Sequence, residues 1–416
     1  MKKVVVKAKI RIFVSRMKRL LQKIGWVLNR IAKTPRNIVS WVARAITPMV
    51  PGRVVCWSHN FQQYSCNPRY LTEYLLEHNP EFEICWVFRN GVDTSQVPES
   101  VRVVRFRTWE YMRLIASAEF LVTNARTDPY RNYWHKRPGQ KYLMLWHAGV
   151  ALKRIEADVE DRLSFSYVQR AKADSRVCDL MISGCRMQTR LQQERFWYNG
   201  EILEVGIPRN DIFFAESRKR ELRERIAKQY GIDPSCRIVL YAPTFRVDYS
   251  TKPYAIDWAK VMPAISRMYG GERVAVMVRM HPNLIGRVDT SSLVAFDNVW
   301  DVTRYPDMQE LLTVADMLIT DYSSSMFDFA MQSRPCLLYA TDVDAYDRGF
   351  YFDVRELPFP LAESEDELID VIEHFDSKEY KSRVDSFFDE RVGLVERGCA
   401  SEALAKWMTD RRINQQ

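Results

Sequence analysis

The chain has 416 residues, 47% of them hydrophobic and 12% aromatic, which is enough to build two ordinary domains with sizeable cores. Its eight cysteines are scattered with no CxxC pair, which argues against a disulfide framework or a zinc site and indicates a reducing, cytosolic compartment. Residues 1–50 hold 13 Lys and Arg and no acid, so the net charge of +8 becomes −5 over residues 51–416, which argues against a broad nucleic-acid surface there.

Residues 1–50 are predicted to form a basic amphipathic helical segment, because apolar side chains recur at steps of three and four with basic ones largely between them. No run approaches 18 uncharged apolar residues, and the features of a signal peptide are missing, so the helix is not predicted to span a bilayer. It suits the interface of an anionic membrane, as a peripheral anchor. Packing on the protein's own body and nucleic-acid binding stay open as alternatives. The apolar positions are Ile10, Phe13, Val14, Met17, Leu20, Leu21, Ile24, Val27, Leu28 and Ile31.

From residue 51 onward, short apolar runs alternate with segments of helical length. This alternation predicts an α/β fold with two Rossmann-like doubly wound lobes, residues 51–212 and residues 213–416, and a cleft between them. The GxGxxG fingerprint is absent, which argues against a dinucleotide redox cofactor. The clearest strands are predicted at 53–58, 83–88, 101–106, 119–124, 141–146, 178–183, 237–243, 273–280, 316–320 and 336–340, and the clearest helices at 67–79, 108–118 and 215–231.

Two of the six histidines stand directly after predicted strands, His147 in the first lobe and His281 in the second. A single histidine at a strand end is often structural, but one in each lobe, at the edge where clefts form, favours a catalytic role. Such a histidine can take a proton from an attacking hydroxyl or donate to a phosphate oxygen. The chain contains no HxxxH, HxH or HExxH spacing, so no metal site is predicted.

Residues 316–340, DMLITDYSSSMFDFAMQSRPCLLYA, are predicted to form a strand, a serine turn, a helix and a second strand. Ser323, Ser324 and Ser325 then lie at a helix start, where free backbone N–H groups favour anions. The serines are therefore candidates for holding phosphate groups. In the alternative interpretation, one serine caps the helix and the others are solvated turn residues.

Seven segments, in this order, resemble a known family: SCNPRYLTEYLLEHNPEFEICWVF, LVTNARTDPYRNYWHKRPGQKYLMLWHAGVALKRI, VGIPRND, YAPTFR, VRMHPN, LITDYSSSMFDFAMQSRPCLLY and DRGFYFD. They resemble the CDP-glycerol glycerophosphotransferases, the teichoic acid primases and polymerases of bacterial cell-wall synthesis, over most of residues 60–360. The resemblance implies a GT-B fold of two facing Rossmann-like lobes. It also implies transfer of a polyol phosphate from CDP-glycerol or CDP-ribitol to a hydroxyl of a lipid-linked acceptor, by a peripheral enzyme at the cytoplasmic face of the membrane.

The resemblance also implies roles for residues. His147 matches the histidine expected to act as general base toward the acceptor, and His281 matches the one beside the donor pyrophosphate. The serine turn matches the segment that holds the phosphates. Further candidates for donor phosphate or nucleotide contacts are Thr244, Arg246, Arg279, Asp321 and Arg348. A salt bridge within the lobe for Arg279, capping at the strand end for Thr244 and Arg246, and fixing of the turn for Asp321 are the alternatives.

The family motif often reads WHGTPLK, whereas residues 146–153 here read WHAGVALK. The His and Lys are kept but the Gly-Thr-Pro turn is not, which leaves the acceptor and the polyol open. The short chain favours a primase or a compact polymerase. Direct displacement of CMP requires no cofactor, and Mg²⁺ on the pyrophosphate stays open. A GT-B glycosyltransferase that uses a nucleotide sugar and a non-catalytic membrane-bound scaffold are the alternatives. Retention of both histidines and the serine turn argues against the scaffold.

Overall fold

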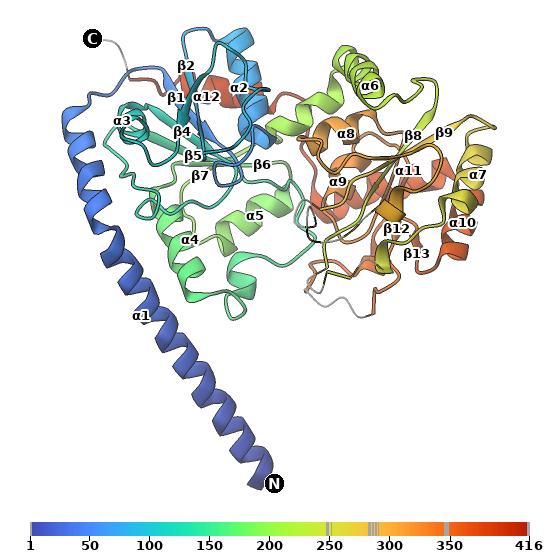
Figure 1. Ribbon diagram of the computed structural model, residues 1–416, viewed down its shortest axis with the longest axis horizontal. Helices are drawn as coiled ribbons and strands as arrows, with labels where there is room; N and C mark the ends of the chain where they lie inside the picture. Colours follow the sequence, from blue (N-terminus) through green and yellow to red (C-terminus); the bar gives the residue numbers. More distant parts are fainter. Residues whose placement is uncertain are drawn as a thin grey trace.

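The structure is a computed structural model that describes residues 2–246, 249–250, 252–281, 284, 287, 289, 291–344 and 349–413, with side chains at 14 and from 17 onward. It contains two parallel β-sheets with helices on their faces, preceded by one long helix (Figure 1). The predicted α/β class with two doubly wound lobes and an N-terminal helix is confirmed.

The first lobe is built on a seven-stranded parallel sheet with the order β3-β2-β1-β4-β5-β6-β7. Its inner strands are short and buried on both faces, as expected where helices cover a parallel sheet, whereas the edge strands β3 and β7 are partly exposed. The strands are β1 (Arg53–Trp57), β2 (Glu83–Phe88), β3 (Arg102–Arg105), β4 (Phe120–Thr123), β5 (Lys141–Met144), β6 (Leu180–Ser183) and β7 (Glu201–Glu204). The helices are α2 (Cys66–His78), α3 (Trp109–Ser117), α4 (Phe165–Val177) and α5 (Arg186–Arg195).

The second lobe is built on a six-stranded parallel sheet with the order β10-β9-β8-β11-β12-β13. The strands are β8 (Arg237–Ala242), β9 (Val274–Val278), β10 (Val299–Asp301), β11 (Met317–Thr320), β12 (Cys336–Tyr339) and β13 (Leu361–Ala362). The helices are α6 (Glu216–Tyr230), α7 (Trp258–Met268), α8 (Met308–Val314), α9 (Ser325–Ala330), α10 (Glu365–Glu373) and α11 (Ser377–Ser386).

Both sheets reverse their strand order at one point, between β1 and β4 in the first lobe and between β8 and β11 in the second. Neighbouring crossovers diverge at such a switch point and leave a crevice beyond the carboxyl ends of the strands, which is where doubly wound sheets bind ligands. The loops after β1, β4, β8 and β11 are therefore the places at which the fold itself predicts a site.

The last helix, α12 (Ala400–Thr409), returns to the first lobe. Leu404, Trp407 and Met408 pack in the same apolar core as β1, β2 and α2, and Figure 1 shows α12 beside α2. By packing, these residues belong to the first lobe, although they lie in the range 213–416 that the sequence assigned to the second. The domain limits otherwise stay a prediction.

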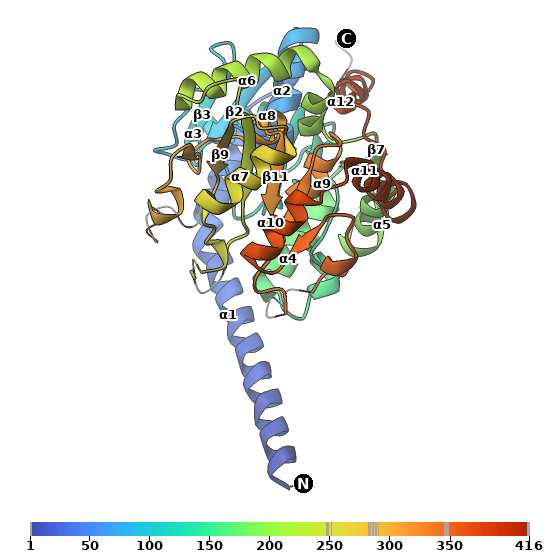
Figure 2. The same cartoon turned by 90° about the vertical axis from the view of Figure 1, so that its right-hand side faces the viewer.

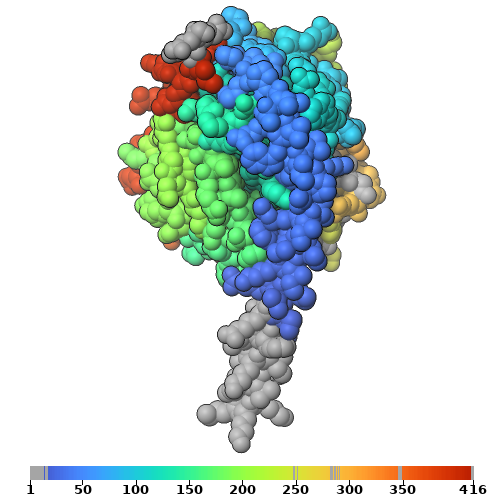
Figure 3. All heavy atoms as spheres, turned by 90° about the vertical axis from the view of Figure 1, so that its left-hand side faces the viewer, coloured from blue at the N-terminus to red at the C-terminus, as the bar shows by residue number. Residues whose placement is uncertain are grey.

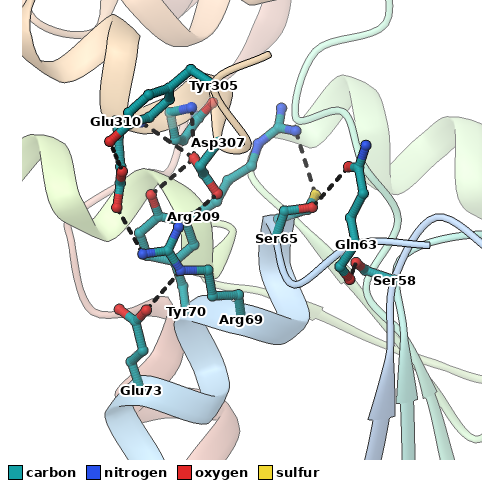
Figure 4. A network of polar contacts seen from close by, with 12 residues as sticks. Ser58, Gln63, Ser65, Arg69, Tyr70, Glu73, Arg209, Tyr305, Asp307 and Glu310 are labelled. Carbon is teal, nitrogen blue, oxygen red and sulfur yellow. Dashed lines mark hydrogen bonds and ion pairs between the residues drawn. The ribbon is translucent and has the colours of Figure 1, made fainter. Parts of the chain in front are cut away.

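Buried ion pairs join the two lobes beside the cleft (Figure 4). Arg69 of α2 pairs with Asp307 at 3.4 Å and with Glu310 of α8 at 2.7 Å, and Tyr70 Oη donates to Asp307 at 3.2 Å. Glu310 also accepts from Arg225 of α6 at 2.7 Å. Because these carboxylates are almost fully buried, each relies on its partners, and the network fixes how the lobes meet.

The long helix α1 (Lys2–Ile46) lies against the first lobe with its C-terminal half, and its N-terminal end extends away from the body (Figures 1 and 2). It contacts α3 and α4. The side chains that face the lobe are polar or small: Asn37, Ser40, Ala43 and Thr47 are buried. The large aliphatic side chains described on α1 are exposed, and in the described part of the chain no helix is long and apolar enough to cross a bilayer.

Candidate active site

A cavity of about 650 Å³ lies between the lobes, at the carboxyl ends of the strands. The first lobe lines it with residues 146–148 and 151–153, from the loop after β5. The second lobe lines it with the loops after β8, β9 and β11. The structure thus brings seven of the predicted residues to one cavity: His147, Thr244, Arg279, His281, Ser323, Ser324 and Ser325.

His147 is held in one orientation by the first lobe. Its Nδ1 lies 3.1 Å from the backbone oxygen of Asn124, the residue that follows β4. A carbonyl oxygen can only accept, so we assign the proton of the neutral ring to Nδ1. The lone pair is then on Nε2, and the ring can act as a base.

His59 completes this arrangement, and sequence reasoning missed it. Its Nε2 lies 3.1 Å from Asn124 Nδ2, and its backbone N–H donates to Asn124 Oδ1 at 2.9 Å. Asn124 therefore touches both histidines, one through its side chain and one through its backbone. His59 follows β1, and its φ of +43° lies in the left-handed region that is uncommon for residues other than glycine. His59, after β1, and Asn124, after β4, lie at the switch point of the first sheet.

Both histidines are neutral at physiological pH. Burial, followed by repulsion from His59, lowers the pKa of His147 from 6.5 to about 4. Burial, followed by repulsion from Arg209, lowers the pKa of His59 to about 4 as well. His147 is exposed where the cavity opens, and the protein around the rest of the ring disfavours its charged form. The cleft therefore presents His147 with an unprotonated Nε2.

The backbone before and at His147 is clamped by three side-chain hydrogen bonds. Asn67 Nδ2, at the start of α2, donates to Leu145 O at 2.9 Å and to Trp146 O at 3.0 Å. Arg209 donates to His147 O at 2.7 Å. Asn67 and Arg209 lie in the segments SCNPRYL and VGIPRND, which are part of the resemblance but for which no role was predicted. In the structure they position the loop that carries His147.

Arg209 also connects this loop to the second lobe. Its guanidinium pairs with Asp328 of α9 at 2.5 Å, and the Asp328 side chain is 2% exposed. Helix α9 begins at Ser325, the last residue of the serine turn. One arginine therefore touches both the loop of the expected base and the helix behind the expected phosphate site.

The serine turn is built differently from an ordinary cap. Ser324 occupies the N-cap position of α9, but its side chain makes no capping hydrogen bond. Ser323 Oγ lies 2.8 Å from Ser325 Oγ and accepts from Ser325 N at 3.3 Å. All three serines line the cavity and are partly exposed. A turn whose hydroxyls face a cavity, with no bond to the helix from Ser324, favours a ligand role over capping.

Thr244 and Arg279 line the same cavity with unused polar groups. Thr244 Oγ1 is buried and has no hydrogen-bond partner in the described residues. Arg279 donates to Tyr305 O at 2.6 Å and forms no ion pair with the described part of the chain, so the predicted alternative of a salt bridge within the lobe is not seen there. Burial lowers the pKa of Arg279, and the charge of Asp307 opposes this only in part. An oxyanion in the cavity would stabilise the charged guanidinium.

Arg246 and Asp321 do not line the cavity. Arg246 pairs with Asp321 at 2.9 Å and with Asp342 at 2.7 Å, and the first pair is almost fully buried. Asp321 also accepts from Thr244 N at 2.8 Å and from Tyr322 N at 2.6 Å. The two side chains thus tie the loop after β8 to the loop after β11, behind the wall. Arg348 lies outside the described residues.

In the residues that the structure describes, no three His, Cys, Asp or Glu side chains are grouped to hold a metal ion. The cavity wall itself contains histidines, hydroxyls and cations, and none of its described residues is a carboxylate. This composition suits a negatively charged ligand and leaves proton transfer to histidine.

The sequence model of the family described as CDP-Glycerol:Poly(glycerophosphate) glycerophosphotransferase matches residues 41–408. The chain belongs to this family. The match includes both sheets, the cavity and the clamping residues, and it begins within α1.

Several relatives of this protein are enzymes of teichoic acid synthesis. The teichoic acid poly(glycerol phosphate) polymerase of Staphylococcus epidermidis is 32% identical over 85% of this chain and 50% of its own length. The polymerase of the same name from Bacillus subtilis is 31% identical over 95% of this chain and 54% of its own. The chain thus spans about half the length of these two relatives. The teichoic acid glycerol-phosphate transferase of Staphylococcus aureus is 30% identical and is covered over 93% of its length.

Solved structures of the wall teichoic acid polymerase TagF share this fold. One, a histidine-to-asparagine variant after a soak with CDPG, has a TM-score of 0.77 and 28% identity, over 95% of this chain and 98% of that one. The structure of TagF itself has a TM-score of 0.76 at the same identity. These likenesses confirm the predicted GT-B arrangement of the two lobes.

Proposed function

We propose that the protein transfers glycerol phosphate, or a related polyol phosphate, from a CDP-activated donor to a hydroxyl of a lipid-linked acceptor. The reaction would belong to the synthesis of teichoic acid or a similar cell-surface polymer, at the cytoplasmic face of the membrane. The observation that carries the proposal is the composition of one cavity. A neutral histidine from the first lobe faces it together with serine hydroxyls and Arg279 from the second, which forms no ion pair with the described residues.

In this proposal the donor pyrophosphate lies against the serine turn, Arg279 and His281. His147 Nε2 takes the acceptor hydroxyl proton as the new O–P bond forms and the bond to CMP breaks, a role worth roughly 10²–10⁴ in rate. The imidazolium that forms still donates from Nδ1 to Asn124 O. The groups on the second lobe hold the negative charge of the transferred phosphoryl, and no covalent enzyme intermediate is needed.

The proposed reaction is tested by incubating the protein with CDP-glycerol, CDP-ribitol or UDP-sugars and a lipid-linked acceptor. We expect release of CMP and incorporation of polyol phosphate into the acceptor. Release of UDP with sugar incorporation would instead identify a glycosyltransferase. Release from no donor would favour the non-catalytic scaffold.

The pH dependence of turnover should reflect the low pKa of His147. Because kcat/KM reports the free enzyme, its acid limb is expected well below pH 6.5, toward the pKa of about 4. The limb of kcat should lie at higher pH, since a bound pyrophosphate stabilises the imidazolium. CMP release measured from pH 4.5 to 9 checks both limbs, and a kcat/KM limb at pH 6.5 or above would contradict the assignment.

A melting curve at each pH is the control for this experiment. His59 and His147 have folded pKa values below the ordinary 6.5. Their contribution to stability is therefore complete above pH 6.5 and declines as the pH falls toward 4. Loss of turnover counts only where the protein remains folded.

Replacing Ser324 and Ser325 by alanine is expected to weaken binding of the CDP donor by about 1–3 kcal/mol, the cost of lost hydrogen bonds to a charged group. Binding of cytidine, which has no phosphate, should change less. Titration of both ligands measures the difference. Ser164→Ala is the matched control, because Ser164 does cap α4 by accepting from Tyr167 N at 3.2 Å. It should lower stability by about 0.5–2 kcal/mol without affecting the donor. Equal loss for cytidine and donor in the double variant would contradict phosphate recognition.

The outward face of α1 supports attachment to an anionic membrane. Among the described residues, most of the exposed large hydrophobic side chains lie on this helix. We call the row formed by Leu20, Leu21, Ile24, Val27, Leu28 and Ile31 the outer stripe; each is 47–62% exposed. Packing on the protein's own body, the alternative from the sequence, involves the polar face instead. Basic residues beside the stripe favour an anionic surface, at about 1 kcal/mol per cation.

Changing Leu21, Leu28 and Ile31 to glutamine should lower the affinity for anionic vesicles at least about 100-fold, since each aliphatic side chain buried in the membrane contributes about 1.5–3 kcal/mol. Sedimentation with vesicles measures this affinity. Stability should hardly change, because these side chains are exposed in the free protein. Trp109→Gln is the control, an exposed apolar side chain on α3 outside the stripe. Unchanged sedimentation of the triple variant would rule out the stripe as the anchor.

A further inference from the structure

A second cavity, of about 290 Å³, lies where α1 crosses the first lobe. One face of α1 forms its first wall, with Gln22, Gly25, Trp26, Asn29, Arg30 and Lys33. The turn at 128–131 and two residues of α4, Ser166 and Arg170, form the opposite wall. Figure 3 shows α1 in blue running over this side of the molecule beside the green segment that contains α4. The cavity is separate from the cleft between the lobes, whose lining it does not share.

The cavity is lined by four cations and one acid. The cations are Arg30, Lys33, Arg131 and Arg170, and within the described part of the chain none of them forms an ion pair or donates a side-chain hydrogen bond. The acid, Asp128, accepts from Arg131 N at 3.0 Å within its own turn, and its charge attracts Lys33. Four positive side chains therefore surround one space that contains a single carboxylate.

Two of these cations lie in an unfavourable electrostatic environment. Arg170 Nε is shut off from solvent and has no acceptor among the described residues. The pKa of Lys33 is lowered by burial and by repulsion from Arg131 and Arg107. A buried N–H without an acceptor and crowded cations are both unfavourable. An oxyanion seated between them would relieve both.

Ring contacts and a hydrogen bond hold Arg30 in the wall of this cavity, and Gly25 leaves space inside it. The Arg30 guanidinium lies 4.0 Å from the Tyr130 ring and 4.9 Å from the Trp26 ring. Tyr130 Oη in turn donates to Arg30 O at 2.9 Å. A glycine inside a helix costs about 1 kcal/mol relative to alanine, yet no atom lies within 4 Å of the position of a Cβ on Gly25. Close packing does not demand this glycine, and its absent side chain leaves space in the cavity.

The cavity lies on the opposite face of α1 from the outer stripe. At 100° per residue, positions 22, 26, 29 and 33 point away from positions 20, 24, 28 and 31. A helix in the interface buries its apolar face at the boundary between headgroups and acyl chains. Because a helix is about 10–12 Å wide, its other face then lies at the level of the lipid phosphates. The cations of the cavity are thus at the depth where phosphodiesters occur.

We propose that this cavity binds the phosphate group of an anionic phospholipid headgroup, with Arg131 and Arg170 of the lobe as the principal contacts and Lys33 and Arg30 of α1 completing the site. The inference rests on the proposed membrane attachment of α1 and names the lipid chemistry that α1 meets there. Seated lipid would join α1 to the lobe through charge, in addition to the hydrogen bonds that Asn37 and Ser40 make to the backbone of residues 130 and 133.

The test is calorimetric titration of the full chain with dihexanoyl phosphatidylglycerol below its micelle concentration, so that no membrane is needed. We expect saturable binding to the wild type, which Arg131→Gln with Arg170→Gln weakens at least tenfold. Arg19→Gln with Arg176→Gln is the matched control, because it removes the same charge from exposed positions of α1 and α4 outside the cavity. Dihexanoyl phosphatidylcholine should bind weakly to all three proteins.

Gly25→Leu provides a variant that fills the cavity without a change of charge. It should abolish binding of the short-chain lipid while CMP release from CDP-glycerol in detergent stays at the wild-type rate, so the lipid site and the proposed reaction are judged separately. Equal weakening by the two charge-matched variants, full binding by Gly25→Leu, or saturation by inorganic phosphate as tight as by the lipid would each overturn the proposal.

Discussion

Replacing His147 by alanine is expected to lower kcat by a factor of about 10² or more while the affinity for the CDP donor changes little. The reason is that His147, as the proposed base on the acceptor side, would act when the proton leaves, whereas the proposed donor-binding groups come from the other lobe. The structure strengthens this expectation because no described residue of the cavity wall is a carboxylate. Initial rates of CMP release with saturating acceptor, together with calorimetric donor titration without acceptor, measure the two quantities.

His281→Ala is the matched comparison for this experiment. Since His281 lines the same cavity from the second lobe, where the donor is proposed to bind, its loss should weaken donor binding as well as turnover. His147→Gln keeps a polar side chain of similar size and should remain as slow as His147→Ala. Turnover near the wild-type rate in either His147 variant would show that another group takes the proton. Asp321 is a poor substitute, because its carboxylate is buried against Arg246.

The central part of the site could be predicted because its residues all follow strands of a parallel sheet. His147, His281 and the serine turn each follow an apolar run, and the carboxyl ends of parallel strands meet at one edge of a sheet. His59 also follows a predicted strand, residues 53–58, but it belongs to a polar segment, and the sequence alone indicates no role for it. Its relation to Asn124 depends on the pairing of β1 with β4, which are about 65 residues apart in the chain. A sequence pattern does not specify such a pairing.

The position of a residue after a parallel strand places it near the carboxyl edge of the sheet but does not determine where its side chain points. Arg246 and Thr244 follow the same strand, yet only Thr244 lines the cavity, because Arg246 turns back to a buried pair with Asp321. Likewise, the spacing along α1 reveals an apolar and a polar face without showing which one meets the body. Asn37 and Ser40 decide this through hydrogen bonds to backbone oxygens of Tyr130 and Tyr133.

Changing Arg209 to methionine is expected to lower both stability and turnover, for reasons that can be separated. The change leaves Asp328, 2% exposed, without its counter-ion, and breaking a buried pair in this way costs about 3–5 kcal/mol of unfolding free energy. It also removes the donor to His147 O. Denaturant unfolding measures the loss of stability, and initial rates of CMP release measure the loss of turnover.

The double variant Arg209→Met with Asp328→Asn distinguishes a positioning role from a purely structural one. Removing both charges eliminates the uncompensated carboxylate, so most of the stability should return. Turnover should not return, because the backbone at His147 still lacks its donor and the base is free to move away from the acceptor hydroxyl. Arg225→Met is the control, since Arg225 pairs with Glu310 at 2.7 Å and forms no hydrogen bond to the loop of His147. If the double variant recovered stability and rate together, Arg209 would act only through the fold. Continued loss of kcat in a stable protein, with donor affinity unchanged, is the result that identifies Arg209 as the residue that holds the base in place.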